Sequence, residues 1–188
     1  MVVDDLVVSK VYPHPIDNKF YESIQVRNSL TFDFISFMDP ESPVFSINHI
    51  CFHGSKWVTK DHLLKFRGRS IAIQGADSIR TDEVIEFIDN WLNGSNTKLE
   101  FMCIISHKKP SIVFNKKEIV ERFNVFPWDP KKRGARFNCI QTMGMSSLID
   151  PLDCTQGMDI ERKSDGMLAT IMMEDFHFRF YIDPITTT

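Results

Sequence analysis

The clearest hydrophobic pattern in the chain lies between positions 81 and 105, where a helical period gives way to a short apolar run. Apolar side chains recur at the spacing that places them on one face of a helix, at Val84, Ile88, Trp91 and Leu92. Thr81 can cap the start of this helix, and Gly94 can take the left-handed conformation that ends it. The run 99–105 is too short for a buried helix and predicts a covered strand. This stretch therefore predicts a helix, a turn and a strand.

Strand and helix patterns alternate on both sides of this unit. Period-two alternation predicts a strand at 30–38, and β-rich runs predict strands at 44–52 and 70–74. Helical patterns lie at 58–66 and 112–123. Apolar residues in two of the strands follow the leucine-rich-repeat strand pattern, at Ile47, Ile50 and Phe52, and at Leu99, Met102 and Ile104. The sequence therefore predicts an α/β fold in which short, irregular, leucine-rich-repeat-like βα units form a parallel sheet.

The two ends of the chain differ from this middle part. Residues 1–29 mix short apolar stretches with charge and predict an edge strand or extended arm that belongs to the same unit as residues 30–188. The stretch 126–155 has no period and predicts a long surface connection. Beyond it, an Asp-Gly turn at 165–166 is flanked by alternating apolar positions. The alternation continues through a core stripe of Phe176, Phe178 and Phe180. We expect one domain that ends in a three-stranded antiparallel β-meander.

Two stretches resemble the nematode F-box-associated domain, type 2. The first, 81–104, has the order of a capped helix, a Gly-Ser-Asn turn and a Leu-initiated strand, at Phe87, Trp91, Gly94, Ser95, Asn96 and Leu99. The second, 161–171, has a turn that leads into Ala-Thr-Ile, with Arg162, Lys163, Asp165 and Gly166. The resemblance spans residues 30–182. It implies a non-catalytic protein-interaction module that recognises the substrate in the adaptor of an SCF-type ubiquitin ligase.

The resemblance also implies a partner that binds outside this domain. Members of the family carry an F-box ahead of the domain, with a Leu-Pro start and a Leu-rich helical run that bind a Skp1-like subunit. Residues 1–19 contain no such sequence. We therefore expect a Skp1-like partner only if an F-box lies outside this chain, and the resemblance does not name the target protein. The alternative is a stand-alone protein- or nucleic-acid-binding module that has lost the F-box and any link to a ubiquitin ligase.

Composition narrows the class of protein. The 188 residues are 43% hydrophobic and 25% charged with a formal net charge of -3, which is typical of a folded domain without overall attraction to nucleic acid or anionic membrane. The four cysteines show no close pairing and no C-x-x-C motif, so they indicate neither a disulfide framework nor a zinc site. The sequence shows no secretory leader and no long apolar run. We expect a cytoplasmic or nuclear protein that does not enter a membrane.

Histidine and cysteine lie close together in the strand predicted at 44–52. His49, Cys51 and His53 would share one face, and they could hold a transition metal only with a further ligand such as His62. Two pairs of residues could act as a nucleophile with its general base, Cys103 with His107 and Ser70 with His62. Neither pair lies in a sequence motif typical of nucleophilic catalysis. The chain also has no glycine-rich phosphate-binding motif. We expect no enzyme activity, no metal and no cofactor.

Strand alternation divides the predicted sheet into two faces. Ile50, Ile71 and Met102 belong to the set that faces the helices, so the residues between them must face the other way. We expect this second face to be open, shallow and weakly polar, and to bind the protein partner through His49, Cys51, His53, Ser70, Ala72 and Gln74. The alternative is that the C-terminal meander covers it.

A basic region lies between positions 107 and 136, where nine Lys and Arg outnumber three acidic residues. A cluster in this region could contact single-stranded nucleic acid through Trp128, Lys131, Lys132 and Arg133. Only one aromatic residue is adjacent, and the cluster lies in a predicted loop. Solvated surface charge is therefore the favoured interpretation, and nucleic acid is not the expected partner.

Overall fold

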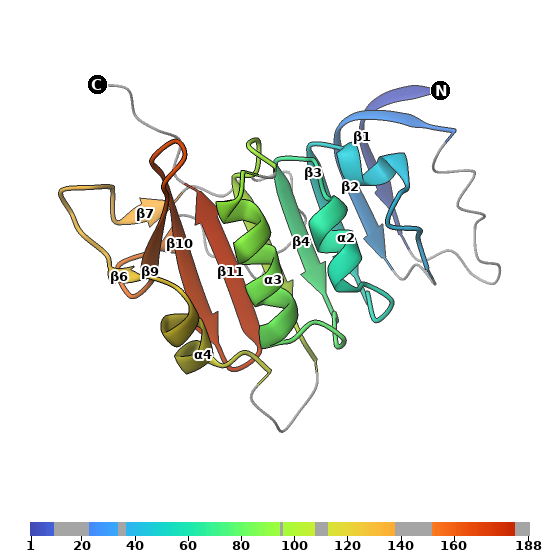
Figure 1. Ribbon diagram of the computed structural model, residues 1–188. Helices are drawn as coiled ribbons and strands as arrows, with labels where there is room; N and C mark the ends of the chain where they lie inside the picture. The colour runs from blue at the N-terminus through green and yellow to red at the C-terminus, as the bar shows by residue number, and fades with distance from the viewer. Residues whose placement is uncertain (10–22, 34–36, 95, 108–112, 138–151, 183–188) are drawn as a thin grey trace.

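The computed structural model describes residues 1–9, 23–33, 37–94, 96–107, 113–137 and 152–182 (Figure 1). Its main feature is one nine-stranded mixed sheet. The strands lie in the order β1 (Val2–Val8), β2 (Gln25–Asp33), β3 (His49–His53), β4 (Ser70–Gln74), β5 (Phe101–Ile105), β11 (His177–Ile182), β10 (Met167–Glu174), β9 (Met158–Arg162) and β6 (Phe126–Pro127). A separate two-stranded ribbon pairs β7 (Arg136–Phe137) with β8 (Leu152–Asp153).

The sheet has a parallel half and an antiparallel half. Strands β1 to β5 run parallel, and each lies beside the next one in the chain. The meander β9–β10–β11 is antiparallel and joins the sheet through β11, which pairs with β5. The predicted parallel βα units and C-terminal meander are therefore confirmed. The leucine-rich-repeat-like description is not confirmed, because the series of βα units ends at β5 and the sheet continues into hairpins.

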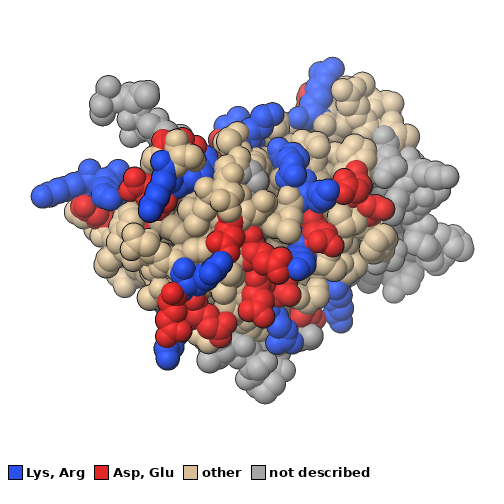
Figure 2. All heavy atoms as spheres, viewed as in Figure 1, with Lys and Arg blue, Asp and Glu red and all other residues tan. Residues whose placement is uncertain are grey.

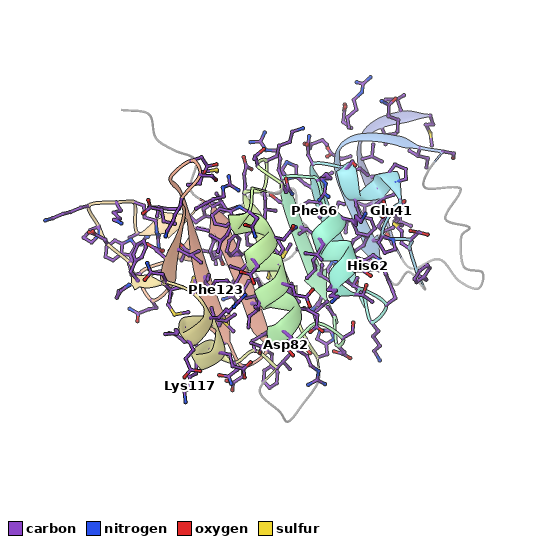
Figure 3. The ribbon with its side chains drawn as sticks, viewed as in Figure 1. Glu41, His62, Phe66, Asp82, Lys117 and Phe123 are labelled. Carbon is purple, nitrogen blue, oxygen red and sulfur yellow. The ribbon has the colours of Figure 1, made fainter. Side chains whose placement is uncertain are left out.

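Three helices pack on one face of the sheet, α2 (Lys60–Lys65), α3 (Thr81–Leu92) and α4 (Lys116–Arg122) (Figure 1). The main core lies between them and the sheet and includes Ile50, Ile71 and Met102, as predicted. Figure 3 labels three buried side chains of this layer: His62 in α2, Phe66 directly after α2, and Phe123 directly after α4. None of the helices in the described ranges has the length and apolar character needed to span a membrane.

Pro43 alters the start of the strand predicted at 44–52. A 3₁₀ turn occupies Pro43–Ser46, because proline favours the first turn of a helix and the Ser42 hydroxyl accepts a backbone N–H within it. Strand β3 begins only after this turn. Strand β2 begins before the strand predicted at 30–38 and also ends earlier, and residues 34–36 lie outside the described part of the chain.

The central helix α3 lies in the predicted stretch, but Thr81 is its first helical residue and Arg80 stands at the cap position, so the expectation that Thr81 caps the helix is wrong. The Glu83 carboxylate accepts the Arg80 N–H at 2.9 Å at the start of the helix. The Thr81 hydroxyl instead accepts the Asn115 N–H at 2.9 Å, which ties α3 to the residue that precedes α4. Gly94 has a φ of 88° directly after the helix, as predicted for a left-handed terminus.

Candidate functional site

The two stretches that carry the family resemblance meet in the core. Trp91 of α3 is 1% exposed, and its ring lies edge-on to Phe180 of β11 with 5.1 Å between the centroids. Arg162 of β9 places its guanidinium 4.6 Å from the centre of the Trp91 ring and donates to the Trp91 carbonyl at 3.3 Å. We call this contact between helix and hairpin the Trp91–Arg162 clasp.

The charge of Arg162 is balanced inside the clasp. Its side chain is fully buried, and it donates to both carboxylate oxygens of Asp165 at 2.7 to 3.1 Å. These hydrogen bonds lower the pKa of the Asp165 carboxyl. Gly166 completes the hairpin turn with a φ of 73°. A guanidinium bound by a carboxylate, a carbonyl and a ring face fixes the hairpin against the end of α3.

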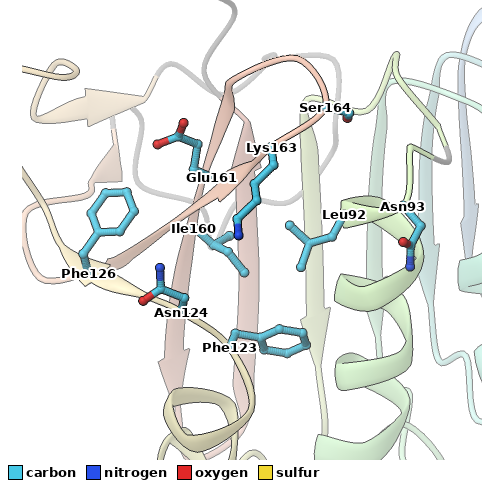
Figure 4. A pocket seen from close by; sticks show the side chains of 9 residues that line it. All are labelled: Leu92, Asn93, Phe123, Asn124, Phe126, Ile160, Glu161, Lys163 and Ser164. Atoms are coloured by element: carbon cyan, nitrogen blue, oxygen red, sulfur yellow. The ribbon is translucent and has the colours of Figure 1, made fainter.

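A pocket of about 640 Å³ opens beside this clasp (Figure 4). Its lining comes from the end of α3 (Leu92 and Asn93), from the segment after α4 (Phe123, Asn124 and Phe126), and from β9 and its turn (Ile160, Glu161, Lys163 and Ser164). The first group directly follows Trp91 in the chain, and the last group surrounds Arg162. The clasp therefore holds two walls of the pocket in place.

The pocket has an apolar floor and a polar rim. Ile160 and Phe123 are buried members of the main core, and Leu92 packs against that core while partly exposed. Asn93 and Asn124 are exposed. Figure 4 shows the apolar side chains directed toward the hollow from separate elements. Such a combination of apolar surface and a few polar groups is typical of ligand sites.

Most charges around the pocket are paired. Glu161 lies 3.7 Å from the ammonium of Lys132, which also stands 4.3 Å from the centre of the Phe126 ring. Arg122 of α4 pairs with Asp89 of α3 at 2.9 Å. Lys163 is exposed, and within the described ranges no carboxylate pairs with it. Figure 2 shows acidic side chains gathered over α3 on the same side of the molecule.

The sheet face predicted to bind a partner is closed. Four of its six side chains are buried: His49, Cys51, Ser70 and Ala72. The other two, His53 and Gln74, are partly buried. Cys51 and Ala72 belong to a second core with Leu152 of β8 and Cys154. The strand alternation is confirmed, but the expectation of an open face is wrong. The described part of the cover comes from the β7–β8 ribbon, whereas the meander lies beside β5 in the same sheet.

Polar groups on this face bind one another. His53 Nε2 lies 3.4 Å from the Cys51 sulfur, and its Nδ1 lies 2.7 Å from Gln74 Oε1. Burial raises the pKa of the Cys51 thiol to about 12 and lowers the pKa of His49. At neutral pH the thiol is therefore protonated and His49 is neutral, so this strand does not present a ready thiolate to a metal or a substrate.

His62, the suggested fourth metal ligand, packs in the main core. Its Nδ1 accepts the Thr59 N–H at 3.0 Å, and its Nε2 lies 2.8 Å from the Met38 carbonyl oxygen. Ser70 points to the opposite sheet face, so the structure does not bring these two side chains together. Burial also raises the pKa of Cys103 to about 12. Within the described ranges no group of side chains has the arrangement of a metal site.

The basic cluster suggested as a nucleic-acid contact fastens a loop to β9. The Arg133 side chain is 4% exposed and pairs with the fully buried Asp159 at 2.6 Å. Lys132 is held by β9 as described above, and the Trp128 N–H donates to a carbonyl of the same loop at 3.3 Å. Lys131 is exposed. These four residues therefore do not form a continuous basic and aromatic strip. Residues 108–112 of the basic region lie outside the described part of the chain.

Comparison with known proteins gives a family match over the central segment. Residues 44–104 match the F-box associated family. The F-box-associated resemblance is confirmed. The F-box-associated segment runs from the 3₁₀ turn to β5 and contains Trp91, but it ends before Arg162 and the hairpin. Ser95 of the signature lies outside the described residues.

A relative extends the similarity beyond the F-box-associated segment. The uncharacterized protein F59B2.8 of Caenorhabditis elegans is 27% identical over 173 residues. The match covers 90% of this chain and 36% of that protein, so the chain spans little more than a third of the relative's length. No solved structure matches the chain.

The sequence does not predict the pocket. Its lining residues come from three segments that become neighbours only when β9 is placed beside α3 and α4. One signal was present, because the two signature stretches directly adjoin or include most of the lining, at Leu92 and Asn93 and at Ile160 to Ser164. The sequence pattern predicts Trp91 in the core and Lys163 in a turn, and neither pattern indicates that the two residues lie near one site.

Proposed function

We propose that this chain is a non-catalytic protein-interaction domain that recognises the substrate of an SCF-type ubiquitin ligase. The main support is the F-box-associated match over residues 44–104, because it relates the central fold to proteins that carry an F-box. An F-box outside these 188 residues would bind the Skp1-like subunit, and this domain would hold the target. This role places the protein in the cytoplasm or the nucleus.

The chemistry of the described residues supports binding and not catalysis. The thiols of Cys51 and Cys103 are buried and protonated at neutral pH, because burial raises the pKa of each to about 12. His62 is held in the core by backbone groups on both ring nitrogens. The pocket beside the clasp, in contrast, combines exposed polar groups with apolar surface. A protein side chain is the kind of ligand that such a surface accommodates.

A fusion of this chain behind a Skp1-binding F-box tests the proposal. Proteins captured by the tagged chain from nematode lysate are identified by mass spectrometry, purified, and added to a reconstituted ligase that contains the fusion. We expect at least one captured protein to receive ubiquitin from the fusion ligase and not from a matched ligase that carries an unrelated domain. If no captured protein is modified above this control, substrate recognition is the wrong function.

A further inference from the structure

We infer that the pocket beside the Trp91–Arg162 clasp binds an internal peptide segment with an apolar side chain next to an Asp or Glu. This inference rests on the proposed function and names the chemistry of the partner. The pocket lies where the helix layer is incomplete, between the end of α3, the segment after α4, and β9 (Figure 4). The walls are preorganised, because the clasp and the Arg122–Asp89 pair hold the surrounding elements together.

The shape of the pocket suits one anchored side chain with its flanking backbone. Its volume of about 640 Å³ is in the range of small-ligand sites, and its apolar floor is formed by Leu92, Phe123 and Ile160. An apolar side chain placed there leaves water and contacts a surface that is already ordered. Asn93 and Asn124 stand exposed on the rim. The Asn93 amide already donates one hydrogen to the Asp89 carbonyl at 2.8 Å, but both side chains keep an amide oxygen that can accept and an amide hydrogen that can donate to a peptide backbone.

The charges around the pocket select a carboxylate. Glu161 is already paired with Lys132, and Arg162 is buried with Asp165, so their charges are balanced within the protein. Lys163 contributes an ammonium at the rim that lacks a carboxylate partner among the described residues. Acidic side chains cover the neighbouring α3 surface (Figure 2), so a peptide carboxylate is favoured on the Lys163 side and disfavoured over the helix.

An internal acidic side chain fits this placement better than a free C-terminus. Lys163 follows β9 and reaches the hollow from its rim, whereas the apolar residues form the floor (Figure 4). A peptide whose backbone lies across the rim can place its apolar side chain against Leu92 and Ile160 and its neighbouring carboxylate beside Lys163. The exposed asparagines can then bind the backbone on both sides of the anchor.

A random decapeptide library displayed on phage tests this inference. The library is selected on the wild-type chain, on Lys163→Glu and on the control Lys56→Glu, which makes the same charge change at an exposed lysine outside the pocket. We expect the wild type and the control to enrich an apolar residue next to Asp or Glu. Lys163→Glu should instead enrich Lys or Arg beside the apolar residue, because the sign of the rim charge is reversed.

The enriched peptide is then synthesised with acetylated and amidated ends, and its Kd is measured by fluorescence anisotropy. We expect Lys163→Glu to weaken binding about tenfold and Lys56→Glu to leave it unchanged. Three results would overturn the inference: no enriched motif, a motif that is the same on Lys163→Glu, or binding that requires a free C-terminal carboxylate. Equal melting temperatures of the two variants exclude unfolding as the cause.

The failure of this inference can be told apart from the failure of the proposed function. If the Lys163→Glu fusion captures and modifies the same proteins as the wild type, the pocket assignment is wrong while substrate recognition stands. If the peptide binds as expected but the wild-type fusion modifies no captured protein, the pocket stands and the ligase role is wrong.

Discussion

Replacing Trp91 with alanine should destabilise the whole domain. The ring is 1% exposed, lies edge-on to Phe180 at 5.1 Å between centroids, and carries the Arg162 guanidinium at 4.6 Å. Removing a buried Trp ring costs about 3 to 5 kcal/mol of unfolding free energy, of which the aromatic and cation contacts account for about 1 kcal/mol each. A loss of this size approaches the total stability of many domains and should lower the Tm by roughly 10 °C or more.

Urea unfolding followed by circular dichroism measures this loss, with two matched variants. Val120→Ala on α4 changes a side chain that is 45% exposed, so we expect a change within about 0.5 kcal/mol. Trp91→Phe should cost less than Trp91→Ala, because it keeps an aromatic ring and because the indole N–H finds no hydrogen-bond partner in the described residues. A soluble Trp91→Ala protein with the Tm of the wild type would refute the assignment of this ring to the core.

Three further predictions concern other described features. Arg133→Met leaves the Asp159 carboxylate buried without its cation and should lower the free energy of unfolding in urea by about 3 to 5 kcal/mol. Adding Asp159→Asn to the same chain should recover part of this loss, because it removes the buried charge. Cys51 and Cys103 should resist Ellman's reagent at pH 8 in the folded protein and react after denaturation, because burial raises the pKa of both thiols to about 12. Rapid reaction of either thiol in the native state would contradict its burial. Gly166→Ala should lower the free energy of unfolding by about 1 kcal/mol, because an alanine is strained at the left-handed φ of 73°. A Cβ at this position meets no atom within 4 Å, so a steric clash would not contribute. Thermal unfolding measures the loss, and an unchanged Tm would show that the turn relaxes.

The sequence predicts most of the parallel half and the meander, because their signals are local. The face of α3 that carries Val84, Ile88 and Trp91 is buried as its helical period requires. The Asp-Gly turn joins β9 to β10, and the alternating residues that follow it form β10 and β11, with Phe178 and Phe180 in the core. In these elements the residues that decide the structure lie a few positions apart, so their pattern is visible in one stretch of sequence.

The errors arise where distant segments decide the structure. The sequence predicts an open face at Cys51 and Ala72, because nothing in β3 or β4 indicates that Leu152, which lies 101 positions after Cys51 and 80 after Ala72, packs on it. Thr81 looked like a cap, but its hydroxyl binds a backbone group at Asn115. The pocket was missed for the same reason, since a hollow between three segments leaves no periodic signal in any of them.

The pairing of β11 with β5 has a consequence for how the chain is made. The last described strand occupies the middle of the sheet, where its residues His177 to Tyr181 lie opposite Ile105 to Phe101. During synthesis the ribosome releases the parallel half first, and β5 then remains an uncovered edge until the C-terminal strand emerges. Any truncation before His177 would leave that edge permanently open to other chains. Protection of the newly made domain from aggregation at this edge therefore depends on β11.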